Sequence, residues 1–154
     1  HARGNSLAPG PRDLIAIIPR IQKHNTHLLV KAADLGIPSK SVENFDNFSK
    51  LIIKNIIRYI NSLIYNYHKN ADTREKITND LANILDNLNY FHPFREGNGR
   101  TQREVIRVLA MMKNYEAIIN IGADDNIYNL YMNGTVYSDK TKLKQLFNII
   151  LRKL

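Results

Sequence analysis

The segment HPFREGNGRTQR, residues 92–103, interrupts two stretches of helical periodicity. Before it, apolar residues at helical spacing predict a helix over about Thr73–Asn89, and after it the same spacing resumes. Proline cannot continue a helix, and glycine adopts backbone angles that other residues resist. Pro93, Gly97 and Gly99 therefore predict a loop between two helices of one core.

The remaining periodicity is also mostly helical and predicts an all-α domain. We expect a short helix over Leu14–Gln22, a strand or helix tail over His27–Lys31, a long helix from a cap at Asp46 or Asn47 through about Tyr67, polar turns at Asn70–Asp72 and Asn133-Gly134, and a final helix over Lys142–Lys153. We expect residues 1–12 to form a flexible N-terminal stretch and residues 13–154 to form a single domain.

The composition narrows the class of protein. The 154 residues contain no cysteine, which excludes a disulfide framework and a thiol nucleophile. The sequence lacks the apolar run of about 18 residues that a membrane span requires, and it shows no secretory signal. We therefore expect a cytoplasmic protein without a membrane partner. The net charge of +8 favours anionic partners such as a nucleotide, nucleic acid or an acidic protein.

The loop carries groups that suit phosphate binding. Successive backbone N–H groups of residues 97–99, followed by a helix N-terminus, can form a nest for an anion. Arg100, Arg103 and Arg107 lie at helical spacing, so their side chains are expected on a common face. A guanidinium group donates hydrogen bonds to phosphate oxygens in pairs. These residues predict a phosphate-binding corner.

Two further side chains add chemistry to this corner. Glu96, a carboxylate beside basic residues, indicates a Mg²⁺ ion shared with phosphate oxygens. The imidazole of His92 can remove a proton from an incoming hydroxyl group. Together these groups predict phosphoryl or nucleotidyl transfer, in which the protein mainly positions groups and neutralises charge. Thr101 and Glu104 also fit the capping box of a helix that begins near Arg100.

Residues 92–103 match the signature HPFx[D/E]GNGRxxR at every position, and the chain resembles the Fic family over about Phe48–Leu154. The resemblance implies a helical domain with the active-site loop between two core helices. It also implies a small β-hairpin flap, expected within Thr26–Asn47, that aligns a target segment. The implied activity is transfer of AMP from ATP to a Tyr, Thr or Ser hydroxyl of a target protein, with release of pyrophosphate.

The resemblance implies a role for each residue of the motif. His92 would be the general base, Phe94 would anchor the loop in the core, and Glu96 would bind Mg²⁺ between the α- and β-phosphates. The groups that would hold the phosphates are the backbone of Gly97, Asn98 and Gly99, the Asn98 side chain, Arg100 at the β-phosphate and Arg103 at the γ-phosphate.

The resemblance also indicates which group is transferred. Its Doc branch, which phosphorylates, has lysine at the position of Arg100, and its phosphocholine-transferring members depart from the sequence GNG. Transfer of AMP is therefore favoured, and transfer of UMP or GMP is the nearest alternative. A further alternative is a non-enzymatic basic module that binds an acidic protein or nucleic acid, although the motif makes nucleic acid the less expected partner.

Regulation and setting are expected from the same resemblance. Many members are inhibited by a glutamate within the pattern [S/T]xxxE[G/N], which Ser39–Asn44 matches with Glu43 as the glutamate. This string lies closer to the motif than the family places its inhibitory helix. The preferred expectation is therefore a separate small antitoxin-like protein, or loss of the regulatory segment. The family favours a bacterial toxin or a delivered effector, which would act in the bacterial or the host cytosol.

Overall fold

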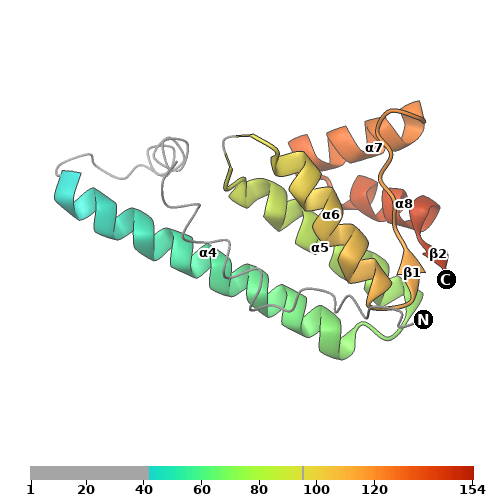
Figure 1. The fold of residues 1–154 in the computed structure, drawn as a ribbon, viewed down its shortest axis with the longest axis horizontal. Coiled ribbons are helices and arrows are strands. Elements are labelled where there is room, and N and C mark those ends of the chain that lie inside the picture. The colour runs from blue at the N-terminus through green and yellow to red at the C-terminus, as the bar shows by residue number, and fades with distance from the viewer. Residues whose placement is uncertain (1–41, 95) are drawn as a thin grey trace, which may run out of the picture.

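The computed structural model describes residues 42–94 and 96–154, which form a bundle of helices (Figure 1). The expected helix over Leu14–Gln22, the expected strand over His27–Lys31 and most of the expected flap lie outside these residues. The helices are α4 (Val42–Asn70), α5 (Arg74–Phe91), α6 (Asn98–Met111), α7 (Asp125–Val136) and α8 (Lys140–Ile150), and the strands are β1 (Tyr115–Glu116) and β2 (Arg152–Lys153).

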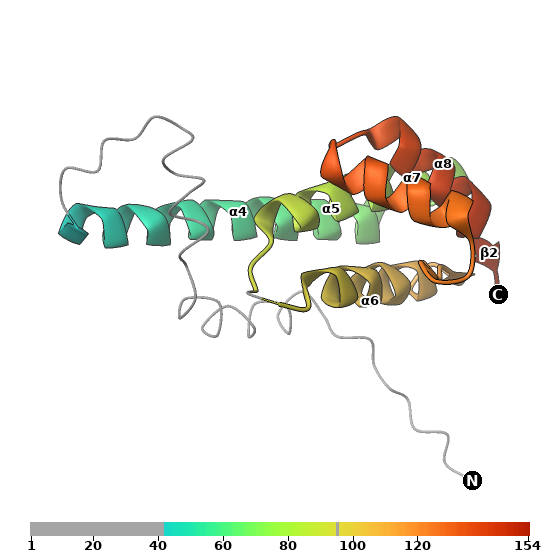
Figure 2. The same ribbon diagram turned by 90° about the horizontal axis from the view of Figure 1, so that it is seen from above.

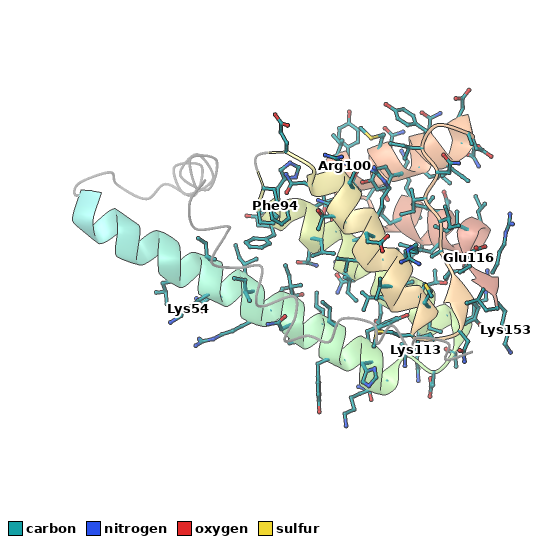
Figure 3. The ribbon with its side chains drawn as sticks, viewed as in Figure 1. Lys54, Phe94, Arg100, Lys113, Glu116 and Lys153 are labelled. Atoms are coloured by element: carbon teal, nitrogen blue, oxygen red, sulfur yellow. The ribbon has the colours of Figure 1, made fainter. Side chains whose placement is uncertain are left out.

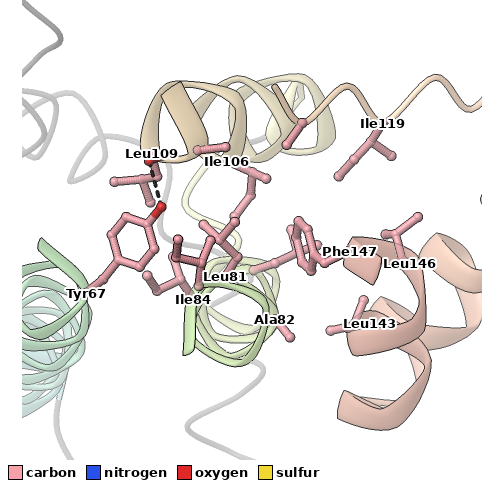
Figure 4. Packing of buried hydrophobic residues seen from close by; sticks show 14 of the residues in the cluster. Tyr67, Leu81, Ala82, Ile84, Ile106, Leu109, Ile119, Leu143, Leu146 and Phe147 are labelled. Atoms are coloured by element: carbon pink, nitrogen blue, oxygen red, sulfur yellow. Dashed lines mark hydrogen bonds between the residues drawn. The ribbon is translucent and has the colours of Figure 1, made fainter. Parts of the chain in front are cut away.

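Helix α5 lies at the centre of the bundle and contacts α4, α6, α7 and α8. Figures 1 and 2 show α4 along one side of α5 and the pair of α7 and α8 on the other. The close-up in Figure 4 shows Leu81 of α5 between Ile106 of α6 and Phe147 of α8, and all three side chains are 0% exposed. The loop between α5 and α6 is therefore carried by two helices that share one core, as the sequence predicts.

The bounds of the helices test the sequence prediction element by element. Helix α5 begins at Arg74, one residue after the predicted start, because Thr73 is its N-cap and the Thr73 hydroxyl accepts a hydrogen bond from the Lys76 N–H group. Helix α4 begins at Val42, so Asp46 and Asn47 lie inside the helix and the predicted cap there is wrong. Asp and Asn are often found at helix caps but also occur inside helices, and no residue between Val42 and Asp46 breaks a helix.

The C-terminal third differs more from the prediction. The predicted turn at Asn133-Gly134 is wrong, because both residues lie inside α7, where Gly134 packs directly against Leu143 of α8. The final helix ends at Ile150, and the residues after Leu151 form β2. From the sequence alone, a glycine that allows two helices to pack closely cannot be distinguished from a glycine in a turn.

The two short strands do not form the expected flap. Tyr115 pairs with Lys153 and Glu116 pairs with Arg152 in an antiparallel register, which fastens the C-terminal end of the chain beside the segment after α6. The expected flap over Thr26–Asn47 is wrong for its last part, Val42–Asn47, because these residues are helical. Within the described residues, no helix is long and apolar enough to cross a membrane.

Tyr67 fastens α4 to α6. Its side chain is 0% exposed, and its hydroxyl donates a hydrogen bond of 2.7 Å to the Leu109 carbonyl oxygen (Figure 4). The Lys113 ammonium lies 5.5 Å from the centre of the Tyr67 ring and donates a hydrogen bond of 2.8 Å to the His68 carbonyl oxygen. Burial, and secondarily the Asp80 carboxylate, raise the pKa of the Tyr67 phenol far above its ordinary value.

We expect Tyr67→Phe to lower the free energy of unfolding by about 1 kcal/mol at pH 7, since it removes one buried hydrogen bond. The raised pKa means that the native state excludes the phenolate, so the stability that Tyr67 contributes is present below about pH 10 and is lost as the pH rises further. Urea unfolding at pH 7, 9 and 10.5 measures both effects. The wild-type advantage over Tyr67→Phe should shrink above pH 10, and an advantage that grows there would contradict the assignment.

Candidate active site

The loop begins with a strained residue. Helix α5 ends at Phe91, and His92 follows in the left-handed region with φ 41° and ψ 58°. Its N–H group donates a hydrogen bond of 3.1 Å to the Leu88 carbonyl oxygen, which closes the helix, and its side chain lies at the surface. A residue with a Cβ atom costs roughly 1–2 kcal/mol in this conformation. The left-handed residue ends α5 and turns the chain into the loop at this energetic cost.

The Asn98 side chain closes the loop from inside. Its Oδ1 atom accepts a hydrogen bond of 2.9 Å from the Phe94 N–H group, and its Nδ2 group donates one to the Phe94 carbonyl oxygen. Asn98 is 4% exposed, and Phe94 packs against the hydrophobic core, as the sequence predicts. The amide side chain thus binds the backbone at Phe94 and fixes the shape of the loop.

Helix α6 starts without a side-chain cap. Its first residue is Asn98, and the preceding Gly97 has φ 82°, which favours glycine, and offers no capping side chain. By contrast, α5, α7 and α8 are capped by the side chains of Thr73, Asp124 and Asp139. Among residues 42–94 and 96–154, no side chain caps the N–H groups in the first turn of α6, and the positive end of the helix dipole faces the loop.

The capping box predicted at Thr101 and Glu104 is wrong. Thr101 lies inside α6, and its hydroxyl donates a hydrogen bond of 3.1 Å to the Gly97 carbonyl oxygen. Glu104 accepts hydrogen bonds of 2.6 and 2.9 Å from the Arg107 guanidinium instead. The helix begins two residues earlier than predicted, at Asn98, because Gly97 supplies the change in backbone direction.

Two of the three predicted arginines lie close to the loop glycines. A Cβ atom on Gly97 would lie 3.5 Å from Nη2 of Arg100, and a Cβ atom on Gly99 would lie 3.0 Å from Nη1 of Arg103. The guanidinium groups therefore lie against the backbone of the uncapped turn, and Figure 3 shows Arg100 and Phe94 at this end of α6. Arg107 does not join them, since it pairs with Glu104 on the exposed side of the helix.

Glu96 supplies the carboxylate of the loop. Its side chain is exposed, and within the described residues it forms no ion pair and belongs to no cluster of three metal-ligating side chains. This donor set fits Mg²⁺ bound together with a nucleotide, because Mg²⁺ keeps water and phosphate oxygens and needs only one or two protein carboxylates. A metal site built entirely from protein side chains would need more ligands than this loop offers.

Sequence reasoning missed two residues around the site. The buried Gln102 side chain donates a hydrogen bond of 3.5 Å to the Leu88 carbonyl oxygen, the same atom that accepts from the His92 N–H group. The Tyr131 hydroxyl accepts a hydrogen bond of 3.5 Å from Nη1 of Arg103. Gln102 lies at an unassigned position of the motif, and Tyr131 lies 28 residues from Arg103 on a helix that the sequence did not predict.

A cavity of about 560 Å³ lies elsewhere, at the start of α5, the opposite end of that helix from His92. It contains no residue of the motif, and it is lined by Arg74, Glu75, Thr78, Asn79, Lys144 and Asn148.

Comparisons with known proteins agree with this architecture. The sequence matches the model of the Fic/DOC family over residues 11–110. A protein adenylyltransferase from Bartonella henselae is 50% identical over 38 residues, which cover 25% of this chain and 7% of that protein.

Two solved structures share the fold. They are the BepC protein, a VirB-translocated effector from Bartonella tribocorum with bound AMPPNP (19% identity, TM-score 0.56, 66% of this chain and 49% of that chain), and the N-terminal Fic domain of a VirB-translocated Bep effector from Bartonella quintana (22% identity, TM-score 0.55, 66% and 46%). The matches thus span less than half the length of each of these proteins.

Proposed function

Because this chain belongs to the Fic/DOC family, whose model matches residues 11–110, we propose that it is a protein adenylyltransferase that transfers AMP from ATP to a hydroxyl group of a target protein. The observation that carries the proposal is the uncapped N-terminal turn of α6, with Arg100 and Arg103 lying against its glycines. The name of the Bartonella henselae relative and the AMPPNP bound to the BepC protein support it.

The phosphates of ATP would bind at the first turn of α6. The N–H groups of residues 97–99 supply neutral donors at the positive end of the helix dipole. Arg100 lies over Gly97 and would bind the β-phosphate, and Arg103 lies over Gly99 and would bind the γ-phosphate. Their positions on successive turns of one helix suit two successive phosphate groups.

His92 would act on the target hydroxyl. The imidazole takes the hydroxyl proton while the oxygen attacks the α-phosphorus of ATP. A new oxygen–phosphorus bond forms, the bond from the α-phosphorus to the bridging oxygen breaks, and pyrophosphate leaves with that electron pair. Glu96 would hold Mg²⁺, which would supply neutralising positive charge to the phosphates.

The test of the activity uses ATP labelled at either of two positions. Compared with lysate alone, lysate with the protein and ATP labelled at the α-phosphate should gain protein-linked label. ATP labelled at the γ-phosphate should give no gain, since kinases of the lysate transfer that label with or without the protein. A gain from the γ-position alone would indicate phosphorylation, and a gain from UTP or GTP alone would indicate a different nucleotide. The absence of a gain in protein-linked label with every donor would overturn the proposal in favour of a binding module.

We expect Arg103→Ala to raise the Kd for ATP about 10- to 100-fold, since hydrogen bonds to a charged group contribute about 1.5–3 kcal/mol. Isothermal titration calorimetry with ATP and ADP measures the change, which should be larger for ATP. Arg107→Ala is the matched control, because that guanidinium pairs with the exposed Glu104 on the same helix. Equal affinity losses in the two variants would argue against a specific role for Arg103.

The setting of the reaction follows from its substrate. ATP is a cytosolic metabolite, so we place the activity in a cytosol, either that of the bacterium or that of a host that receives the protein as an effector. Control by Glu43 and control by a separate small inhibitory protein both stay proposals, since the first half of the Ser39–Asn44 string, residues 39–41, lies outside the described residues. The division of the chain at residue 12 likewise stays a prediction.

A further inference from the structure

We propose that Tyr131 is a positioning residue that holds Arg103 ready for the terminal phosphate of the nucleotide. This proposal rests on the proposed function and assigns a role to a residue outside the motif. Nη1 of Arg103 donates a hydrogen bond of 3.5 Å to the Tyr131 hydroxyl, and Cζ of Arg103 lies 5.7 Å from the centre of the Tyr131 ring. One side chain thus contacts the guanidinium through both its ring and its hydroxyl.

Tyr131 is itself held firmly. Its side chain is 5% exposed and belongs to the hydrophobic core. Its carbonyl oxygen accepts a hydrogen bond of 2.8 Å from the Thr135 hydroxyl one turn further along α7. Because a buried ring has few alternative rotamers, Tyr131 offers a fixed surface to the partly buried Arg103.

Gly99 completes the arrangement. A Cβ atom at Gly99 would lie 3.0 Å from Nη1 of Arg103 and 3.6 Å from the Tyr131 hydroxyl. The guanidinium therefore lies between the backbone of the anion-binding turn and the phenol of α7. A Cβ atom at position 99 would require the guanidinium to shift by a few tenths of an ångström.

The consequence is preorganisation. An unrestrained arginine side chain loses conformational entropy about several rotatable bonds when it binds a phosphate, and that loss weakens binding. Tyr131 restricts Arg103 before the nucleotide arrives, and the phenol leaves most of the five N–H donors of the guanidinium available. A tyrosine on α7 thus acts on nucleotide binding through an arginine on α6.

The first test observes Arg103 without any nucleotide. The Nε–H resonance of Arg103 in ¹⁵N-labelled protein, assigned by its loss in Arg103→Lys, should be shifted by the ring current of Tyr131. In Tyr131→Leu the resonance should move to the position of an unrestrained arginine, and Tyr131→Phe should lie between the two. The proposal would be overturned if the Arg103 Nε–H resonance of the wild-type protein already had the chemical shift of an unrestrained, freely rotating arginine.

The second test is a double-mutant cycle on ATP affinity. We expect Tyr131→Leu to raise the Kd for ATP about tenfold, because leucine removes both the ring and the hydroxyl from the guanidinium. Tyr131→Phe keeps the ring and removes only the hydroxyl, so it should raise the Kd about threefold. In the Arg103→Ala background, Tyr131→Leu should have no further effect. Additive effects would assign Tyr131 a merely structural role and overturn the proposal.

The two tests separate this proposal from the proposed function. A restrained Arg103 resonance together with coupled ATP affinities, but without AMP transfer, would overturn the activity and leave the positioning role in place. A restrained resonance in a protein that binds no ATP would overturn the phosphate role of Tyr131 together with the activity. Melting temperatures of all variants, measured in parallel, show whether a loss of affinity arises from unfolding.

Discussion

His92→Ala is expected to lower the rate constant of AMP transfer about 10²- to 10⁴-fold and to leave the Kd for ATP unchanged. The reason is that different groups of the loop are expected to bind ATP and to act on the hydroxyl. The phosphates are expected on the N–H groups and arginines of α6, whereas His92 belongs to the end of α5 and acts on the incoming hydroxyl. Single-turnover transfer from labelled ATP measures the rate, and calorimetry measures the affinity.

The backbone at this position requires a second variant. His92 has φ 41°, and alanine resists that conformation, so His92→Ala alone could disturb the loop. Asparagine tolerates the left-handed region but is not a base, so His92→Asn keeps the turn and removes the proton acceptor. Both variants should lose transfer. Transfer at the wild-type rate by His92→Asn would rule out general-base catalysis by His92.

The loop could be predicted from the sequence because its chemistry is contiguous. The helix before it and its stop at Pro93 follow from residue type and spacing, whereas the position of Phe94 against the core follows from the family resemblance. The proximity of Arg100 and Arg103 to the glycines also follows, since these residues lie within the first two turns of α6. Spacing alone misplaced two other features of this segment, the capping box at Thr101 and Glu104 and the side chain of Arg107.

Contacts between distant segments could not be predicted in this way. Tyr131 reaches Arg103 from another helix, and nothing in the spacing of either residue indicates the contact. The role of the Asn98 amide also escaped prediction, because the same side chain could bind a phosphate or the loop backbone, and only coordinates show that it binds Phe94. The two-residue strands β1 and β2 are too short for a periodic pattern.

The misread glycine of α7 leads to the largest expected effect on stability. A Cβ atom at Gly134 would lie 2.4 Å from Cδ2 and 2.8 Å from Cγ of Leu143, whose side chain is 0% exposed in the hydrophobic core. We expect Gly134→Val to lower the free energy of unfolding by about 3 kcal/mol, at the upper end of the cost of overpacking. The melting temperature should fall by roughly 10 °C.

Gly122→Val is the matched control for this prediction. Gly122 is exposed, and the nearest atom to an added Cβ is Oδ1 of Asn120 at 3.8 Å. Surface substitutions of this kind change stability by less than about 0.5 kcal/mol, so the difference between the two variants isolates the contact of α7 with α8. Equal melting temperatures would mean that the helices separate at little cost. Since α7 also carries Tyr131, such loose packing would remove the fixed surface against which Arg103 is positioned.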